Sequence, residues 1–500
     1  MKGYAETLAT RADHPAFIAG GRSVTYAELD HRASQLAHVL HEAGVAEGDR
    51  LGVMLPNSIE FAEALAASAK VGAAVVTLNW HLRPDEVAWI LDDSDAAVLI
   101  AHESLRAQVE SVTEERGRPV LWVGGDYESR LAGSSPEPVP YVWPTSWPVL
   151  YTSGTSGRPK GVIHGGSPQA EVMEMALDGL VALWGYRPDD VHLVAGPMYH
   201  AGPSGYAGAT LYASGTVVAM DGWDAREFLR LVGEHRVTTT FLTPAHFIRI
   251  LEVPEDERAA VDLSSLRHVI HGGAPCPTSV KERIIAAFPD AEIWELYGAS
   301  EGGATRVSSA EWLERPGTVG RPWPGVEIRI ADRVTGDAKP VGEDGLIYVR
   351  PARGRFEYHN DPAKTADTWR EDDFTVGDIG HLDADGYLYL TDRASDLIIR
   401  AGVNVYPREV EDVLYAHPAV VDCAVFGVPD ERDGEHPVAV VEVRSVVTAE
   451  ELVAYCRERL DPYKCPVKVE LVDTLPRDPN GKVLKRHLRD AAWAGTGRQI

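Results

Sequence analysis

The sequence predicts an α/β protein with a large N-terminal domain and a small, mobile α+β C-terminal domain. The 500 residues exceed the length that one hydrophobic core usually organises. Strand and helix patterns alternate through the first half of the chain, as in a parallel sheet covered by helices. From about residue 317, short strands are separated by Gly, Asp and Pro turns, and the pattern changes again after Arg393. We therefore expect a domain over 1–393, with two helix-covered sheets and a small β-rich unit, and a second domain over 394–500, joined by a hinge near 393–396.

The first helix-covered layer begins with a helix that Thr25 and Glu28 open as a capping-box pair. Apolar side chains then recur every three or four residues, which is typical of an amphipathic helix. The elements predicted next are a strand at 50–56, a helix at 58–70, a strand at 73–79, a helix at 83–93 and a strand at 96–101.

The second layer repeats this alternation, although the two layers share no evident sequence repeat. Its predicted strands are 144–151, 191–196, 215–220, 237–243, 266–272 and 292–298, and its helices include 224–236 and 276–288. The last hundred residues predict a helix at 407–416, strands at 419–426 and 437–444, and a helix at 449–460.

Composition excludes several classes of function. The net charge of −27 argues against non-specific binding to nucleic acid or anionic membranes. Four scattered cysteines without CxxC spacing indicate neither a zinc site nor a disulfide framework. We find no apolar signal-peptide core and no apolar run approaching 18 residues, so we expect a cytoplasmic protein without an integral membrane segment.

Residues 151–162, YTSGTSGRPKGV, are the most informative stretch of the chain. Glycines let backbone N–H groups converge on an anion, hydroxyls add donors, and Lys160 adds a compact positive charge suited to phosphate. The preceding apolar segment predicts a strand, so we expect the loop to leave a strand end, where α/β sheets bind ligands. The spacing does not fit a Walker A loop. A Ser/Gly-rich surface linker is the alternative.

The stretch resembles the phosphate loop of the acyl-adenylate-forming family, which includes acyl-CoA synthetases, adenylation domains and luciferases. The family signature is aromatic-TSGT[ST]G-x-PKG, and the chain matches it with Ser156 where threonine is commoner. The resemblance implies that ATP phosphates are bound by Thr152, Ser153, Gly154, Thr155, Ser156, Gly157 and Lys160.

Two further motifs follow predicted strands. In HGGAP, Gly272 and Gly273 allow a ligand to approach the backbone closely, although a tight strand-to-helix turn explains them equally well. In YGASEGG, residues 298–302 also fit the G-x-S-x-G nucleophile elbow of a serine hydrolase, with Ser300 as the nucleophile. A hydrolase gives no role to residues 151–162.

The resemblance implies a different role for these motifs. Tyr297 would pack beside adenine, Ser300 would meet the α-phosphate, and Glu301 would help hold Mg²⁺, which prefers carboxylate and phosphate oxygens. The other nucleotide-binding residues predicted here are Gly272, Gly273, Ala274, Gly298 and Ala299.

The family match extends to the acid and the ribose. His200 would border the acyl pocket, which we expect to include Gly202, Ser204, Gly205, His271 and Gly303. The small residues in this set would leave room for a bulky or extended acid. Asp378 would accept the ribose hydroxyls, Arg393 would contact the nucleotide, and Ser395 would be the hinge, where Asp or Lys is more usual.

Lys482, in LPRDPNGKVLKR, matches the catalytic lysine of the family. A carboxylate must approach an α-phosphate of like charge, and an ammonium at about 4 Å offers roughly 4 kcal/mol per contact at an effective dielectric near 20. A solvated basic tail is the alternative. The catalytic set predicted here is Lys482, Glu301, Ser300 and His200.

The resemblance implies an ATP-dependent ligase that forms an acyl-adenylate, releases pyrophosphate and passes the acyl group to the thiol of CoA. Ala401 and Gly402 would line the acceptor channel, where acyl-CoA synthetases often read S-G-G and this chain reads R-A-G. An amide ligase using an amino acid acceptor, a stand-alone adenylation partner for a carrier protein, a serine hydrolase and a non-catalytic nucleotide-binding module are the alternatives. The expected partners are a small carboxylic acid and CoA, with a homodimer as the candidate assembly.

Overall fold

The structure is a computed structural model that describes residues 2–142, 144, 148–152, 159–164, 170–352, 354–478 and 481–493. The chain forms two compact units. The first unit comprises residues 1–241, 261–268 and 353–367, and the second comprises 242–260, 269–352 and 368–500. The predicted domain boundary near 393 lies inside the second unit and stays a prediction.

The first unit contains most of the alternating helices and strands. They are α1 (Lys2–Arg11), β1 (Pro15–Ala19), β2 (Arg22–Thr25), α2 (Tyr26–Glu42), β3 (Arg50–Met54), α3 (Ile59–Val71), β4 (Ala74–Thr77), α4 (Pro84–Asp93), β5 (Ala96–His102), α5 (Arg106–Glu114), β6 (Val120–Val123), α6 (Tyr127–Gly133), β7 (Leu150–Thr152), β8 (Lys160–His164), α7 (Ala170–Trp184), β9 (Val191–Val194), α8 (Ala201–Tyr212), β10 (Thr216–Ala219), α9 (Ala225–His235), β11 (Thr239–Leu242), β18 (Phe356–Tyr358) and α14 (Pro362–Thr368), with a short 3₁₀ turn at Glu103–Leu105.

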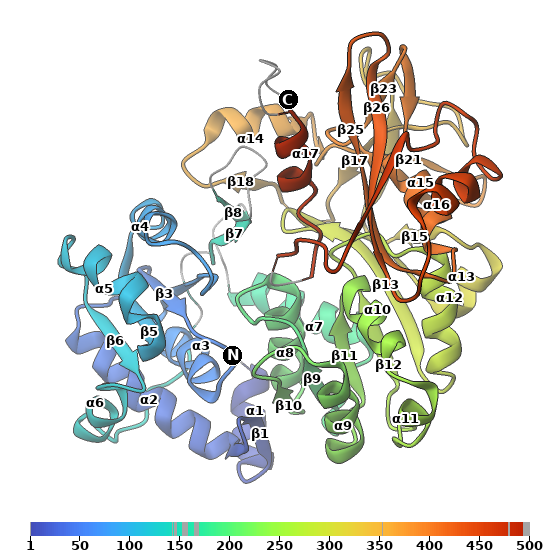
Figure 1. Cartoon of the computed structure of the whole chain (residues 1–500). Helices are drawn as coiled ribbons and strands as arrows, with labels where there is room; N and C mark the ends of the chain where they lie inside the picture. The colour runs from blue at the N-terminus through green and yellow to red at the C-terminus, as the bar shows by residue number, and fades with distance from the viewer. Residues whose placement is uncertain are drawn as a thin grey trace. The chain divides into compact units, whose positions relative to one another are not determined.

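A parallel sheet with the strand order β4, β3, β5, β6 lies between two layers of helices (Figure 1). Leu51 and Val53 of β3 pack into one core with α2 and α3. Met54 belongs to another core, formed with α4 and α5. Successive side chains of a strand point to opposite faces, so a strand buried on both faces reads as a continuous apolar run. The sequence predicts this sheet correctly.

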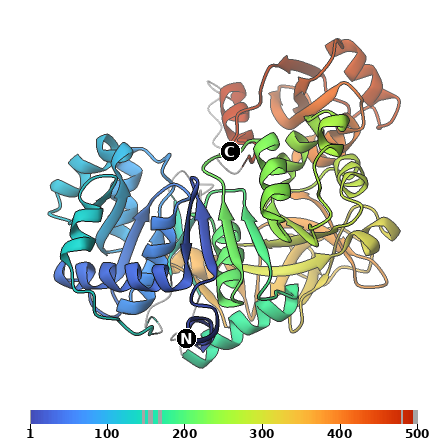
Figure 2. The same ribbon diagram turned by 90° about the horizontal axis from the view of Figure 1, so that it is seen from below.

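Five further strands of the first unit follow the order β11, β9, β10, β1, β2, as part of a 15-stranded sheet (green and dark blue strands in Figure 2). All neighbouring strands among these five run parallel except β1 and β2. Because β9 lies between the later strands β10 and β11, the chain order reverses beside it. Such a switch point leaves a crevice beyond the carboxyl ends of the strands, where α/β proteins bind ligands. His200 follows β9 at this edge.

The loop expected to cradle phosphate lies between two paired strands. β7 and β8 are antiparallel, and β8 also pairs with β18, so the three form a small sheet of their own. β7 ends where the loop begins, as predicted, and Val149 just before β7 forms a parallel bridge with Val76 of β4. The return of the chain as β8, antiparallel to β7, was not predicted. Ser153, Gly154, Thr155, Ser156 and Gly157 lie outside the described residues.

The second unit carries the rest of the chain. Its elements are α10 (Pro244–Glu252), α11 (Glu255–Ala259), β12 (His268–His271), α12 (Thr278–Ala287), β13 (Glu292–Ala299), β14 (Gly302–Val307), α13 (Ser309–Glu314), β15 (Thr318–Pro322), β16 (Glu327–Ala331), β17 (Gly345–Arg350), β19 (Trp369–Arg370), β20 (Asp373–Phe374), β21 (Asp378–Leu382), β22 (Leu388–Arg393), β23 (Ile398–Arg400), β24 (Val403–Val405), α15 (Pro407–Tyr415), β25 (Val420–Asp430), β26 (Gly434–Val443), α16 (Ala449–Arg457), β27 (Lys468–Val472) and α17 (Lys485–Trp493).

Two sheets organise the second unit. The strands of this unit in the larger sheet lie in the order β12, β13, β14, β15, β22, β21, β17, β20, β19, and β16 pairs with β17. The C-terminal sheet has the order β24, β23, β26, β25, with β27 beside β26, and it shares a core with α15 and α16. This arrangement confirms the predicted α/β class with an α+β C-terminal part. Across the described ranges, no helix is long and apolar enough to span a bilayer.

Candidate active site

Three side chains from different strands of the second unit form a hydrogen-bonded group. The hydroxyl of Tyr297, on β13, donates to Asp378 Oδ2 at 2.8 Å. Arg393 Nε donates to Asp378 Oδ1 at 3.1 Å, and the two residues face each other across β21 and β22. All three residues were predicted to bind the nucleotide, and the structure brings them together.

The charges of this group are mutually supportive. Burial and the adjacent Asp378 carboxylate raise the pKa of Tyr297 well above its usual value, so the phenol remains a donor. Burial alone would lower the pKa of Arg393, but the negative charges of Asp378 and Asp396 outweigh it and the pKa rises. Asp378 thus stays between a permanent cation and a neutral hydroxyl.

Lys482 lies in a tight loop held by Asp478. The backbone N–H of Lys482 donates to Asp478 Oδ1 at 2.9 Å, and the Asp478 N–H donates to the carbonyl of Lys482 at 2.9 Å. The loop packs on the start of α10, because a Cβ on Gly481 would lie only 2.6 Å from Ala245. Asp478, which holds this loop, was not singled out from the sequence, although Asp in D-P-N-G is a recognisable turn signal.

The electrostatic surroundings place Lys482 beside the nucleotide group. Two causes lower the pKa of Lys482: the larger is partial desolvation by the surrounding protein, and the smaller is repulsion from the Arg393 guanidinium. The carboxylates of Asp478, Asp396 and Asp378 oppose that shift. The side chain remains exposed to solvent. The Lys482 ammonium therefore lies within electrostatic reach of Arg393 and Asp378.

The HGGA segment is a strand-to-helix turn between β12 and α12. A Cβ on Gly272 would lie 2.7 Å from the carbonyl oxygen of Leu296, so only glycine fits beside β13. Gly273 is exposed and adopts φ +82°, which L side chains rarely adopt. The internal packing explains Gly272 fully, whereas Gly273 and the half-buried Ala274 leave the turn open to a ligand.

Ser300 and Glu301 form the two-residue turn of the β13–β14 hairpin, because Ala299 pairs with Gly302. A nucleophile elbow requires a helix after the serine. Here a strand follows, so the serine hydrolase interpretation of Ser300 is wrong. Gly298 sits in the same hairpin, where a Cβ would lie 2.8 Å from the Gly302 carbonyl.

His200 and Ser204 lie at the beginning of α8, at the switch point of the first unit. Burial lowers the pKa of His200 to about 4, so the ring is neutral at pH 7. Its Nε2 is buried and has no hydrogen-bond partner among the described residues. Ser204 Oγ donates to the His200 carbonyl at 2.8 Å, which fixes the first turn of the helix.

Three predictions for the acyl pocket need correction. A Cβ on Gly202 would lie 2.7 Å from the Phe241 ring, and a Cβ on Gly303 would lie 2.5 Å from the Trp323 ring, so aromatic side chains occupy the space that the glycines leave. His271 is 0% exposed and packs edge-on against Phe247, so it does not face an open pocket. Sequence spacing alone could not pair Gly202 with Phe241. Gly205 keeps its open space, with nothing within 4 Å of a Cβ.

The remaining predicted site residues lie at strand ends and turns. Thr152 ends β7 and Lys160 begins β8, so they flank the phosphate-loop segment. Ser395 is exposed just after β22. Ala401 and Gly402 form the exposed turn between β23 and β24, where their φ angles are +49° and +80°. Of the described residues, only Asp430, Asp433 and His436 form a three-ligand group, and Glu301 is not part of it.

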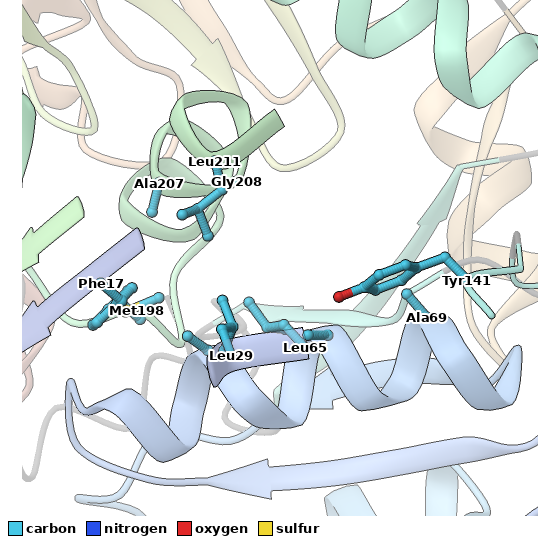
Figure 3. Close-up of a pocket in the computed structure, with 11 residues that line it drawn as sticks. Phe17, Leu29, Leu65, Ala69, Tyr141, Met198, Ala207, Gly208 and Leu211 are labelled. Atoms are coloured by element: carbon cyan, nitrogen blue, oxygen red, sulfur yellow. The ribbon is translucent and has the colours of Figure 1, made fainter. Parts of the chain in front are cut away.

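An apolar cavity of about 80 Å³ lies behind α8 in the first unit (Figure 3). It is enclosed by α2, α3, β1 and the far side of α8, which contributes Ala207, Gly208 and Leu211. Tyr141 lies over Ala69, and its hydroxyl points toward the apolar side chains. The cavity lining does not include His200, Gly202 or Gly205.

Comparisons with known proteins identify the family of the chain. Residues 4–353 match the family described as AMP-binding enzyme, and residues 409–482 match the AMP-binding enzyme C-terminal domain. A feruloyl-CoA synthase from Amycolatopsis sp is 36% identical over 480 residues, which cover 94% of each chain. The fatty acid–[acyl-carrier-protein] ligase ScoC from Streptomyces coeruleorubidus is 33% identical over 510 residues, which cover 99% of this chain and 97% of the relative.

Solved structures give the same result. The amide bond synthetase McbA from Marinactinospora thermotolerans superimposes with a TM-score of 0.85 at 33% identity, over 98% of this chain and 99% of the other. The family match spans well over half of the chain. The chain therefore belongs to the AMP-binding enzyme family, and it is an ATP-dependent ligase that activates a carboxylic acid as an acyl-adenylate.

Proposed function

We propose that the protein is an AMP-forming acid–CoA ligase for a small carboxylic acid. The observation that carries this proposal is the hydrogen-bonded group of Tyr297, Asp378 and Arg393 with Lys482 beside it. Tyr297 would pack beside adenine, Asp378 would accept the ribose hydroxyls, and Arg393 would contact the nucleotide. Lys482 would neutralise charge between the attacking carboxylate and the α-phosphate, where a preorganised cation acts most strongly in the transition state.

The hairpin turn and the phosphate loop would act on the remaining phosphate oxygens. Ser300 would meet the α-phosphate, while Thr152, Ser153, Gly154, Thr155, Ser156, Gly157 and Lys160 would hold the departing pyrophosphate. Glu301 fits a magnesium ligand because its carboxylate stands at an accessible turn beside this group. Magnesium would supply charge neutralisation on the phosphates. His200 and Gly205 would border the acid, and the neutral His200 ring suits an uncharged acyl body.

The acceptor is proposed to be the CoA thiol, reached through the Ala401–Gly402 turn. The similarity to a feruloyl-CoA synthase supports it. Two other acceptors have support of their own. The similarity to ScoC favours a carrier-protein thiol, and the similarity to McbA favours an amine. Arg400, which stands where acyl-CoA synthetases often have serine, is a departure that an amide ligase would also fit. We place the reaction in the cytoplasm, which suits the four reduced, buried cysteines.

The assignment is tested by pyrophosphate exchange against a panel of carboxylic acids. Products should then be identified by mass with CoA, an acyl-carrier protein and amino acids competing at equal concentration. We expect exchange that requires both Mg²⁺ and an acid, and acyl-CoA as the main product. A dominant amide or acyl-carrier product would replace the proposed acceptor, whereas exchange without an acid would contradict the whole mechanism.

Lys482→Ala separates the two half-reactions. We expect it to abolish acid-dependent pyrophosphate exchange, because no other ammonium is proposed to join the carboxylate and the α-phosphate. Thiolysis of supplied acyl-adenylate by CoA should be largely retained. Lys468→Ala, at the exposed start of β27, is the control for loss of a positive charge. Equal loss of both half-reactions in Lys482→Ala would contradict the two-step assignment.

A further inference from the structure

Helix α15 of the C-terminal part is capped from outside its own segment. It begins at Pro407, and its N-cap residue Tyr406 makes no side-chain capping bond. Instead, Asp392 Oδ2, at the end of β22, accepts a hydrogen bond from the backbone N–H of Arg408 at 3.0 Å. A carboxylate at this position satisfies one of the orphan donors of the helix and complements its dipole.

The side chain of Arg408 makes a second contact with β22. Its Nη1 donates to the carbonyl oxygen of Leu390 at 3.0 Å, so the backbone and the side chain of Arg408 both form hydrogen bonds with β22. Arg489 of α17 adds a bond to the carbonyl of Ser395 at 3.1 Å. We call the pair of Asp392 and Arg408, joined by the bond from the Arg408 backbone N–H to the Asp392 carboxylate, the clasp. Between its two residues lie the proposed hinge and the whole β23–β24 hairpin, including the Ala401–Gly402 turn.

Hydrogen bonds connect the clasp to the group formed by Tyr297, Asp378 and Arg393. Asp392 Oδ1 accepts from the backbone N–H of Arg393 at 2.8 Å, and Arg393 in turn binds Asp378. On the other side, α15 shares its core with the C-terminal sheet. The loop of Lys482 follows that sheet. The clasp therefore fixes the C-terminal part at the strand that carries the nucleotide site.

We infer that Asp392 and Arg408 are positioning residues that hold Lys482 beside Arg393 and Asp378, and so support adenylation but not acyl transfer. This inference rests on the proposed function. If the hinge turns to present the Ala401–Gly402 turn to the acceptor, the bonds that cross it from Arg408 to Asp392 and Leu390 must break. The clasp is then a contact of the first half-reaction alone.

Three variants test the clasp in the full-length enzyme. Asp392→Ala removes the cap, and we expect about a 10-fold lower rate of pyrophosphate exchange, which corresponds to the loss of one helix cap. Thiolysis of supplied acyl-adenylate should be unchanged or faster. Asp392→Asn keeps one acceptor oxygen for the Arg408 N–H but loses the second acceptor, so it should restore part of the exchange rate. Arg408→Ala keeps the backbone donor and should lower kcat of exchange while the KM for ATP stays constant.

Asp383→Ala is the matched control. Asp383 Oδ1 accepts two backbone N–H bonds, from Asp385 and Tyr387, in the turn between β21 and β22, on one side of the hinge only. We expect it to affect both half-reactions equally or not at all. Equal losses in Asp392→Ala, or no loss in Arg408→Ala, would overturn the inference. Should Asp392→Ala not fold, the comparison of Asp392→Asn with Arg408→Ala decides the outcome. If the wild-type enzyme does not use CoA, the proposed acceptor is wrong. The loss of pyrophosphate exchange in Asp392→Ala and Arg408→Ala still measures the contribution of the clasp to adenylation.

Discussion

The carboxylate of Asp378 has more acceptor sites than its two hydrogen-bond donors occupy. Its two oxygens offer about four acceptor sites, and the structure uses one on each oxygen, for Tyr297 and Arg393. Among the bonds of the described residues, two acceptor sites thus remain, which would suit the vicinal diol of the proposed ribose ligand. Because both existing partners are donors, they hold the carboxylate in place without competing for the remaining acceptor sites.

Ala401 is a strained residue in the proposed acceptor turn. Both turn residues have positive φ, which is typical of a two-residue hairpin turn of type I′. For an L-residue this conformation costs roughly 1–2 kcal/mol, and glycine avoids that cost. We expect Ala401→Gly to raise the free energy of unfolding by about 1 kcal/mol, measured by urea denaturation. Gly402→Ala should shift it in the opposite direction. Shifts of the same sign in both variants would contradict this account.

Two of the three glycines of helix α8 have contrasting surroundings. Gly208 lines the apolar cavity behind the helix, whereas Gly205 is exposed near His200, and neither has a neighbour within 4 Å of a Cβ. Alanine is favoured over glycine inside a helix by roughly 1 kcal/mol. We therefore expect Gly208→Ala to stabilise the protein by about that amount without changing the KM for the acid.

Gly205→Ala supplies the contrast to Gly208→Ala. It gains the same helix propensity, but its methyl group would enter the proposed acyl pocket, so we expect a higher KM for bulky acids. Thermal unfolding and acid kinetics of the two variants measure both effects. A raised KM in Gly208→Ala would mean that the cavity belongs to the acid site.

A buried ion pair joins α12 to β13. Lys281 Nζ lies 2.6 Å from Glu295 Oε2, and both residues are almost completely buried, with the Trp312 ring 5.3 Å from the ammonium. Removing one partner leaves an uncompensated buried charge, which costs about 3–5 kcal/mol. We expect Glu295→Gln to be destabilised by that amount in urea unfolding. The apolar double variant Lys281→Met with Glu295→Leu should recover most of the loss, and a double variant as unstable as the single one would refute the argument.

For the whole molecule, the periodic part of the fold could be predicted from the sequence. The capping box of Thr25 and Glu28 and the buried strand β3 are both present, because local hydrogen bonds and burial on two faces leave direct patterns. The hairpin β7–β8 was missed, since its pairing with β18 joins segments almost 200 residues apart. The polar site group of Tyr297, Asp378 and Arg393 was predicted by family resemblance, whereas the aromatic partners of Gly202 and Gly303 depend on tertiary packing that no local pattern records.

The pH dependence of stability is a property of both units together. His192 in the first unit and His246 in the second are buried, and burial lowers the pKa of each to about 3. In the unfolded chain these histidines titrate near 6.5, so between pH 6.5 and pH 3 the unfolded state binds more protons than the folded state. Stability is therefore lost as the pH falls through that range, by up to about 1.4 kcal/mol per histidine and pH unit.

Buried carboxyls such as Asp412 oppose this trend, and one variant isolates the contribution of His246. Burial raises the pKa of Asp412 to about 6, so its contribution falls as the pH rises from 3.8 to 6. In His246→Gln, the glutamine can still accept the bond from the Thr243 N–H that completes the cap of α10, but it cannot titrate. Urea unfolding at pH 7.5, 6.5, 5.5 and 4.5 should give this variant a shallower acid loss than wild type, by about 1.4 kcal/mol per pH unit. Identical slopes would show that His246 is protonated in the folded protein, contrary to its burial.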